Sequence, residues 1–146
     1  VETMCKIQIN RHINVHGAYN YLYTSKDADG VRLSSSSPHS GNIRAEYNTR
    51  IPRYATVVNL SGNIMGKKKF DVLDELEIDG KKVEAYYQAK VNPYCLWDLT
   101  VSQYIMQNLR ITAGITNLFD YTSDRVTFNT STSPGRNYFI ACNYTL

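Results

Sequence analysis

Three histidines are the side chains in this chain of 146 residues that are best suited to hold a metal or a cofactor. His12 lies in the short polar segment Asn-Arg-His, His16 lies within an alternating segment, and His39 lies in the serine-rich stretch SSSSPHSG. Imidazole is a common iron ligand in haem proteins, but none of the three has a partner at the spacing of a metal site. We therefore expect His12 to be a solvated turn residue, His16 a hydrogen-bonding group and His39 a loop residue.

The other reactive side chains predict neither catalysis nor a bound metal. The serines lack a nearby histidine and carboxylate that would activate a nucleophile. Cys5, Cys95 and Cys142 lie far apart without a CxxC pair, so zinc is not expected and the cysteines are interpreted as small apolar residues. The net charge of +3 comes without a basic stripe, so no nucleic-acid partner is expected. No catalytic residue, metal or cofactor is predicted.

Alternation of apolar and polar side chains is the main structural signal, and it predicts β-strands. The segments that alternate are residues 1–9, 13–24, 42–49, 56–65, 95–105, 109–116 and 138–146. Short linkers take turns with long ones, which predicts an antiparallel up-and-down sheet with one plain rim and one elaborate rim. The long linkers cover residues 25–41, 67–93 and 120–136. Asp79-Gly80 in the second of them is typical of a type I′ hairpin and predicts a projecting ribbon.

The two faces of these segments differ in chemistry. One face is apolar, with tyrosines toward the strand ends, and the other mixes charges with small polar residues. This pattern fits a membrane barrel around a wet lumen, and it also fits a soluble sheet with a buried apolar face. The strand lengths and the position of the tyrosines favour the membrane barrel. Seven strands leave two unpaired edges, so either one strand is missed or the chain is part of a larger barrel.

The end of the chain carries a family resemblance. NLRITAGITNLFDYTS is followed by a loop and then by SPGRNYFIACNYTL. The Asn-Leu-Phe-Asp run at residues 117–120, and the Pro-Gly-Arg and aromatic residue at 134–138, resemble the last two strands of TonB-dependent outer-membrane receptors. YCLWDLTVSQYI and SPHSGNIRAEYNT resemble earlier strands of the same family. The resemblance covers nearly the whole chain but only about the last third of a full receptor.

The resemblance implies an all-β fold of antiparallel up-and-down transmembrane β-barrel strands, about seven in number, that are part of a larger barrel. Residues 1–146 would be the C-terminal segment of that barrel, with the plug domain and the N-terminal strands absent. It further implies the bacterial outer membrane as location and the import of a scarce nutrient, such as an iron chelate carried by a siderophore, haem or cobalamin. The expected partners are outer-membrane lipid, the plug domain and remaining barrel of the same receptor, TonB through the plug, and a surface lipoprotein.

The same resemblance assigns the two rims and the two faces. It places the C-terminus and the short turns on the periplasmic side and the long loops outside the cell. The residues expected to contact cargo at the outer rim are His39, Tyr86 and Tyr121. The polar residues expected to face the lumen, where charges pair with one another or with the plug, are His16, Arg44, Glu46, Asp98 and Arg110.

Two other classes of protein remain open from the sequence. One is a complete, eight-stranded outer-membrane barrel with a structural or adhesive role. The other is a soluble, lipocalin-like binder whose cavity takes a small apolar ligand. A folded, monomeric protein in buffer without detergent would identify the soluble binder, and the length of the parent gene separates the small barrel from a receptor.

Overall fold

The computed structural model describes residues 1–23, 37–78, 81–105, 107–122 and 135–145, with the backbone alone at residues 69–78 and 81–89. The described residues form β-strands and turns. No helix among them is long and apolar enough to cross a membrane.

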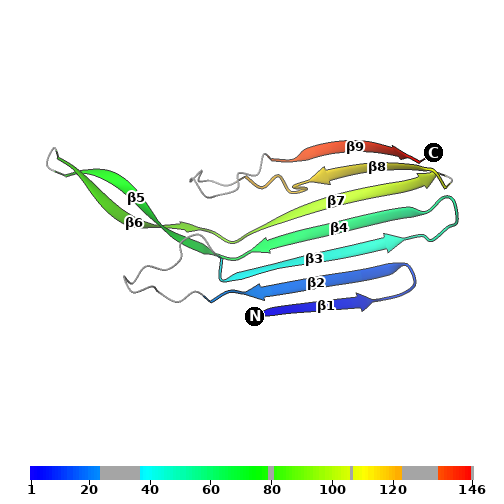
Figure 1. Ribbon diagram of the computed structural model, residues 1–146, viewed down its shortest axis with the longest axis horizontal. Helices are drawn as coiled ribbons and strands as arrows, with labels where there is room; N and C mark the ends of the chain where they lie inside the picture. Colours follow the sequence, from blue (N-terminus) through cyan, green and yellow to red (C-terminus); the bar gives the residue numbers. More distant parts are fainter. Residues whose placement is uncertain (24–36, 79–80, 106, 123–134, 146) are drawn as a thin grey trace.

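The described residues form nine strands (Figure 1). They are β1 (Glu2–Gln8), β2 (Ile13–Tyr21), β3 (His39–Asn48), β4 (Thr56–Met65), β5 (Lys68–Ile78), β6 (Lys81–Val91), β7 (Tyr94–Ile105), β8 (Leu109–Thr116) and β9 (Asn137–Tyr144). Seven of them form one sheet in the order β1-β2-β3-β4-β7-β8-β9, and β5 pairs with β6 in a separate ribbon. Every pair is antiparallel. The predicted all-β, antiparallel up-and-down fold with seven sheet strands is confirmed.

The connections sort onto two rims, as the linker lengths predict. The turns from β1 to β2, from β3 to β4 and from β7 to β8 lie together at the right-hand end of Figure 1, and the ribbon of β5 and β6 projects beyond the opposite end. β5 starts soon after β4 ends, and β6 leads directly into β7, so the ribbon prolongs two neighbouring sheet strands. The pairing of Ile78 with Lys81 confirms the predicted hairpin, although Asp79 and Gly80 themselves lie outside the described residues.

The predicted start of β3 is wrong by three residues. The strand begins at His39 rather than Asn42, because both neighbouring strands extend far enough to pair with it. Tyr21 of β2 lies opposite His39, and Met65 of β4 lies opposite Ser40. The polar stretch gives little alternation to read, but two flanking strands offer hydrogen-bond partners to its backbone, and a backbone with partners on both sides becomes part of the sheet.

The register separates the sheet into the two faces that the alternation predicts. One cross-strand row on the apolar face consists of Ile7, Val15, Ala45, Leu60, Leu99, Ile115 and Tyr138. Side chains in such a row lie directly opposite one another and contact across the strands. We call this side of the sheet the apolar face and the other side the polar face.

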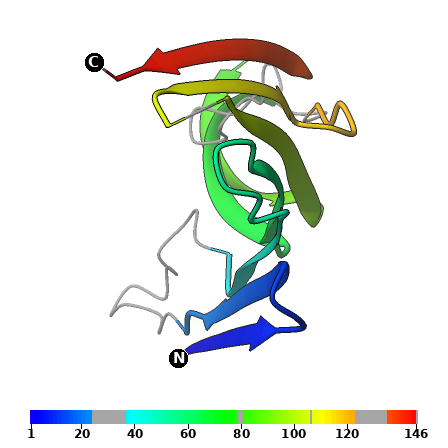
Figure 2. The ribbon, with the colours of Figure 1, turned by 90° about the vertical axis from the view of Figure 1, so that its right-hand side faces the viewer.

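The apolar face is not covered by a second layer of the described chain. Val91 is the only buried apolar side chain among those described, and no large side chain is fully buried. Ile140 is 81% exposed, Val101 is 38% exposed and Ile111 is 39% exposed, so these three are not sealed inside a globule. Figure 2 shows the sheet as one twisted layer running from β1 to β9.

Two glycines let aromatic rings lie flat against the sheet. The Trp97 indole on β7 covers Gly62 on β4, where an added Cβ would lie 2.9 Å from the ring. On the polar face, the Phe139 ring on β9 covers Gly114 on β8, and an added Cβ there would overlap the ring. An aromatic ring over a glycine of the next strand restores the contacts that the glycine lacks and helps to fix the register.

The contact between Gly114 and Phe139 can be tested by a double-mutant cycle. Gly114→Ala should lower the free energy of unfolding by about 1–3 kcal/mol, because the new methyl group displaces the ring. In a Phe139→Ala background the same substitution should be neutral or stabilising by about 0.5–1 kcal/mol, since alanine suits a strand better than glycine. Chemical denaturation of the four proteins gives the coupling.

Gly17→Ala is the control for that cycle. An added Cβ at Gly17 meets only a backbone oxygen at 3.9 Å, so no loss of stability is expected in either background. Equal effects of Gly114→Ala with and without the Phe139 ring would contradict the assigned contact.

Candidate functional site

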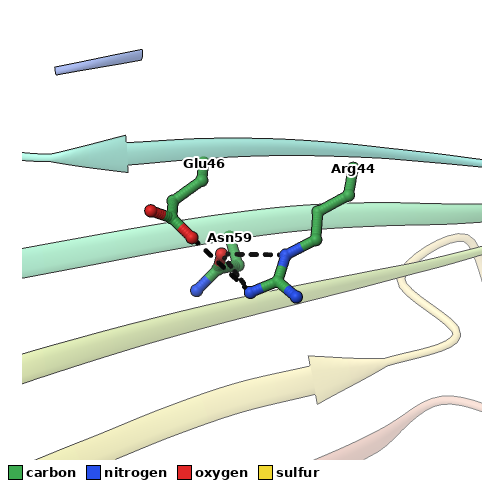
Figure 3. A network of polar contacts seen from close by, with 3 residues as sticks. All are labelled: Arg44, Glu46 and Asn59. Carbon is green, nitrogen blue, oxygen red and sulfur yellow. Dashed lines mark hydrogen bonds and ion pairs between the residues drawn. The ribbon is translucent and has the colours of Figure 1, made fainter. Parts of the chain in front are cut away.

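The polar face carries a charged group on the two central strands. Arg44 on β3 donates to Oδ1 of Asn59 on β4 from Nη2 at 2.9 Å and from Nε at 3.3 Å. The same Nη2 lies 3.6 Å from Oε2 of Glu46 (Figure 3). The side chains of Arg44 and Glu46 are 56% and 30% exposed, so water screens the ion pair and it contributes at most about 1 kcal/mol. The contacts with Asn59 and Glu46 therefore orient the guanidinium, but they add little to the stability of the fold.

The register extends this group into a row of polar side chains across five strands. The row consists of Lys6, His16, Arg44, Ser61 and Asp98. Lys6, His16 and Arg44 are therefore neighbours on β1, β2 and β3. The carboxylate of Asp98 lies two strands away from Arg44, on β7. Glu46 on β3 and Arg110 on β8 lie on the same face, so the polar face mixes charges of both signs.

Asp98 and Arg110, both expected on the polar face, do not pair with each other in the structure. Oδ1 of Asp98 accepts a hydrogen bond from the backbone N–H of Asn117 at 2.9 Å. The Cζ of Arg110 lies 5.9 Å from the centre of the Tyr104 ring, directly opposite it on β7. Asp98 thus caps the end of β8 near the long loops, and Arg110 lies near the short turns.

Residues 117–121, which carry the Asn-Leu-Phe-Asp run, form a closed turn at the end of β8. The Asn117 side chain donates to the carbonyl of Tyr121 at 2.7 Å and accepts from its N–H at 2.8 Å. The N–H of Asp120 donates to the carbonyl of Asn117 at 2.9 Å. Asn117 and Asp120 have φ of 52° and 57°, a left-handed conformation that Asn and Asp tolerate better than most residues. The residue types in this run therefore suit the turn.

A second contact joins this turn to the start of β9. Oδ1 of Asp120 accepts a hydrogen bond from the N–H of Arg136 at 2.8 Å. Gly135 has φ of 83° and lies so close that an added Cβ would be 3.1 Å from the same oxygen. The Asn-Leu-Phe-Asp run and residues 135–136, just before β9, are thus held together.

An aromatic pair lies beside this turn at the long-loop rim. The rings of Tyr94, at the start of β7, and Tyr121 are stacked, with centroids 4.9 Å apart and planes inclined by 9°. Both residues are half-buried, so the stack is partly accessible from outside. Tyr121 is one of the predicted cargo-contact residues, and the structure adds Tyr94 as its partner.

His39, another predicted cargo-contact residue, lies on the apolar face at the same rim. Its Nδ1 is 2.6 Å from the Tyr19 hydroxyl, and its ring contacts those of Tyr19 and Tyr21. This position follows from the register, because His39 is directly opposite Tyr21. The third candidate, Tyr86, lies on β6 opposite Leu73, and its side chain is outside the described part of the chain.

Two polar side chains that sequence reasoning missed are Asn59 and Gln103. Asn59 is the acceptor for Arg44. The two residues are 15 positions apart in the sequence, and no local pattern predicts their contact. Gln103 occupies an apolar-face position, where it accepts from the Thr56 hydroxyl at 2.6 Å and donates to the carbonyl of Tyr54 at 3.1 Å. A glutamine that breaks the apolar alternation of residues 97–105 is the signal that could have identified it.

The described residues contain no group of three or more His, Cys, Asp or Glu side chains that could hold a metal ion. Cys5, Cys95 and Cys142 are free thiols on the apolar face. The polar face and the long-loop rim carry hydrogen-bonding, charged and stacking groups.

No protein-family model and no curated protein matches the sequence. Solved structures do match. The ferripyoverdine receptor of the outer membrane of Pseudomonas aeruginosa, bound to ferripyoverdine, aligns with a TM-score of 0.75 at 18% identity over 98% of this chain and 19% of its own. A mutant of the ferric enterobactin receptor of the same organism aligns with a TM-score of 0.73 at 18% identity, over 98% of this chain and 21% of its own.

The chain has the fold of these outer-membrane β-barrel receptors. At 18% identity the likeness concerns the fold, and the chain spans about a fifth of the length of the receptors it matches. The similarity therefore lies in the strands and their order, which is the barrel region.

The contact between Asp120 and Arg136 can be tested by three substitutions at one position. Asp120→Ala should lower stability by about 1–3 kcal/mol, because the Arg136 N–H loses its acceptor. Asp120→Asn keeps an acceptor and tolerates the positive φ, so it should cost much less. Asp120→Gly also tolerates the positive φ but has no acceptor, so its loss of stability should lie between those of the other two variants.

Hydrogen exchange of the amides from Arg136 to Ile140 measures the effect locally. Faster exchange is expected in Asp120→Ala and near-normal exchange in Asp120→Asn. Equal exchange in all three variants would show that the carboxylate does not hold the start of β9.

Proposed function

We propose that this chain is part of a TonB-dependent outer-membrane receptor that imports a ferric siderophore. The observation that carries the proposal is a single-layer antiparallel sheet with an exposed apolar face, which aligns over 98% of its length with two solved receptors for ferric siderophores. The motifs at residues 117–120 and 134–138 support it independently, because they resemble the end of the same family. The proposed role is transport, with no catalytic step.

The apolar face supports placement in the bacterial outer membrane. A membrane leaves no water for unpaired backbone groups, so β-strands cross it only when each is paired in a closed barrel. The sheet strands pair along their length, and their outward apolar residues suit hydrocarbon. Sheet strands of 7–12 residues are close to the length needed for a tilted crossing.

The two outer strands support the proposal that residues 1–146 are the C-terminal segment of a larger barrel. Within the described residues, β1 and β9 are at opposite edges of the sheet and each pairs on one side only. Closure of the barrel then requires strands outside this chain, and the polar face would meet a plug domain that TonB pulls on. A lipoprotein above the long loops is a further proposed partner.

The rims and faces divide the proposed roles among the predicted residues. His16, Arg44, Glu46, Asp98 and Arg110 share the polar face and would line the lumen or meet the plug. The stack of Tyr94 and Tyr121 at the long-loop rim is suited to contact an aromatic or planar cargo. Haem and cobalamin remain alternative cargoes from the sequence. His39, the residue that the sequence suggests for haem, lies on the apolar face, where its Nδ1 already contacts the Tyr19 hydroxyl, so its position does not favour haem.

The two other classes fit the structure less well. A lipocalin-like binder needs an apolar interior, whereas the described apolar side chains are exposed on one side of an open sheet. A complete small barrel needs its first and last strands to pair, and β1 and β9 do not pair within the described residues.

A pair of adjacent substitutions on β3 tests the membrane placement. Ile43 and Asn42 are both exposed but lie on opposite faces. In the intact protein, Ile43→Arg should destabilise folding into lipid vesicles by about 2–4 kcal/mol, the cost of arginine near the middle of a bilayer. Asn42→Arg, on the polar face, should change it by less than about 1 kcal/mol. Equal effects of the two variants would argue against hydrocarbon on the apolar face.

Uptake of iron tests the cargo. A strain lacking the gene should lose TonB-dependent uptake of radioactive iron from its ferric siderophore, and the intact gene should restore it. Tyr121→Ala should weaken siderophore binding by about twofold to tenfold, the worth of one aromatic stack. Tyr144→Ala, at the other end and on the apolar face, is the matched control. Normal iron uptake without the gene, across a panel of siderophores, would exclude the proposed cargo class.

A further inference from the structure

The short turns carry charge of one sign. We define the short-turn rim as residues 9–12, 49–55 and 107–108. It contains the arginines Arg11, Arg50 and Arg53 and no aspartate or glutamate. The ribbon at the opposite rim mixes both signs, with Lys67, Lys68 and Lys90 among several acidic residues. The separation of charge between the two ends is therefore a property of this chain.

The three guanidinium groups are available to a ligand. All three arginines are exposed. Arg11 donates from Nε to Nε2 of His12 at 2.9 Å, and the only ion pair among the described residues is the one between Arg44 and Glu46 on the polar face. With arginines and no aspartate or glutamate in these turns, the rim attracts anions.

The longest turn of this rim is held rigidly by hydrogen bonds. The N–H of Arg50 donates to Oδ1 of Asn48 at 2.8 Å, and the N–H of Thr49 donates to the carbonyl of Thr56 at 3.0 Å. Gln103 reaches over from β7 and donates to the carbonyl of Tyr54 at 3.1 Å. The arginines of this turn therefore start from fixed backbone positions, which lowers the entropy lost on binding.

The backbone of this turn does not explain why arginine is there. Arg50 has φ of 53° and Arg53 has φ of 69°, a left-handed conformation in which Gly, Asn and Asp are favoured. A turn built only for its shape would carry those residue types. Strained positions that persist often have a role in binding, and two arginines in one turn share this strain.

Exposed apolar side chains lie in the turn that carries Arg50 and Arg53 and at the same end of the sheet. Ile51 and Tyr54, in the same turn as Arg50 and Arg53, are each 53% exposed. Tyr144 is 64% exposed on the apolar face at the same end of the sheet. Aromatic rings next to cations at the end of an apolar face are typical of the headgroup region of a membrane.

We propose that the short-turn rim binds the phosphate headgroups of anionic phospholipids through Arg11, Arg50 and Arg53. A guanidinium pairs with two oxygens of a phosphate at once, and Ile51 and Tyr54 would enter the boundary between headgroups and acyl chains. The proposal rests on the proposed function, because it requires that hydrocarbon covers the apolar face. It adds that the charge of the short-turn rim selects anionic lipids in the leaflet next to the short turns.

The test compares lipids retained by the intact protein. The protein is purified in detergent, mixed with equal amounts of phosphatidylglycerol and phosphatidylethanolamine, and analysed by native mass spectrometry. The variant R11Q/R50Q/R53Q removes the charges but leaves the positive-φ positions occupied by a side chain of similar conformational cost. Retention of phosphatidylglycerol relative to phosphatidylethanolamine should fall on the order of fivefold for each arginine removed.

The variant K67Q/K68Q/K90Q is the matched control, since it removes three positive charges from the opposite rim. It should retain phosphatidylglycerol as the unmodified protein does. An unchanged preference in R11Q/R50Q/R53Q, or an equal loss in the control, would overturn the proposal. If the triple variant does not fold, as judged by circular dichroism, Arg53→Gln alone should still give about a fivefold fall, and no fall would overturn it.

Two further arms separate the possible outcomes. Inorganic phosphate at millimolar concentration should not displace the lipid, and displacement would show a site for soluble anions instead. An intact protein that stays folded in buffer without detergent would overturn the proposed function and this inference together. A protein that inserts into membranes but shows no preference for the anionic lipid would overturn the inference alone.

Discussion

Backbone hydrogen bonds between neighbouring strands hold the seven-stranded sheet together. Val91 is the only buried apolar side chain among those described, so the described residues do not form a packed core that could hold the strands together. Pairing between neighbouring strands satisfies the backbone N–H and C=O groups. An apolar solvent would strengthen these hydrogen bonds, because unpaired groups could not bond to water there. The side chains are then free to give each face of the sheet its own chemistry.

At the strand ends, where backbone pairing stops, polar side chains form hydrogen bonds with backbone groups of the turns. At the long-loop rim, Asp98 accepts from the Asn117 amide and Asp120 accepts from the Arg136 amide. At the short-turn rim, Gln103 donates to carbonyl groups of the neighbouring turn. These contacts fix the direction in which each loop leaves the sheet. The Tyr94 and Tyr121 stack lies at the long-loop rim and the three arginines lie at the short-turn rim, so the strand ends carry both candidate binding surfaces.

The candidate site was predictable as a set of residues but not as a set of contacts. Alternation alone assigns His16, Arg44 and Asp98 to one face, because side chains two apart on a strand point the same way. The partners of these groups depend on register. Arg44 binds Asn59 rather than a distant acid, and Asp98 caps the turn at Asn117 instead of pairing with Arg110. A one-residue slip between strands would change every one of these neighbours.

The strands, their two faces and the alternation of short and long connections are predictable from the sequence, because a period of two and the turn residues are local properties. The start of β3 at His39, the stack of Tyr94 on Tyr121 and the open apolar face emerge only when the strands pair. Those features come from hydrogen bonds between segments far apart in the chain. The sequence of one strand does not specify which residues of another strand it pairs with, so the register is set only when the strands pair.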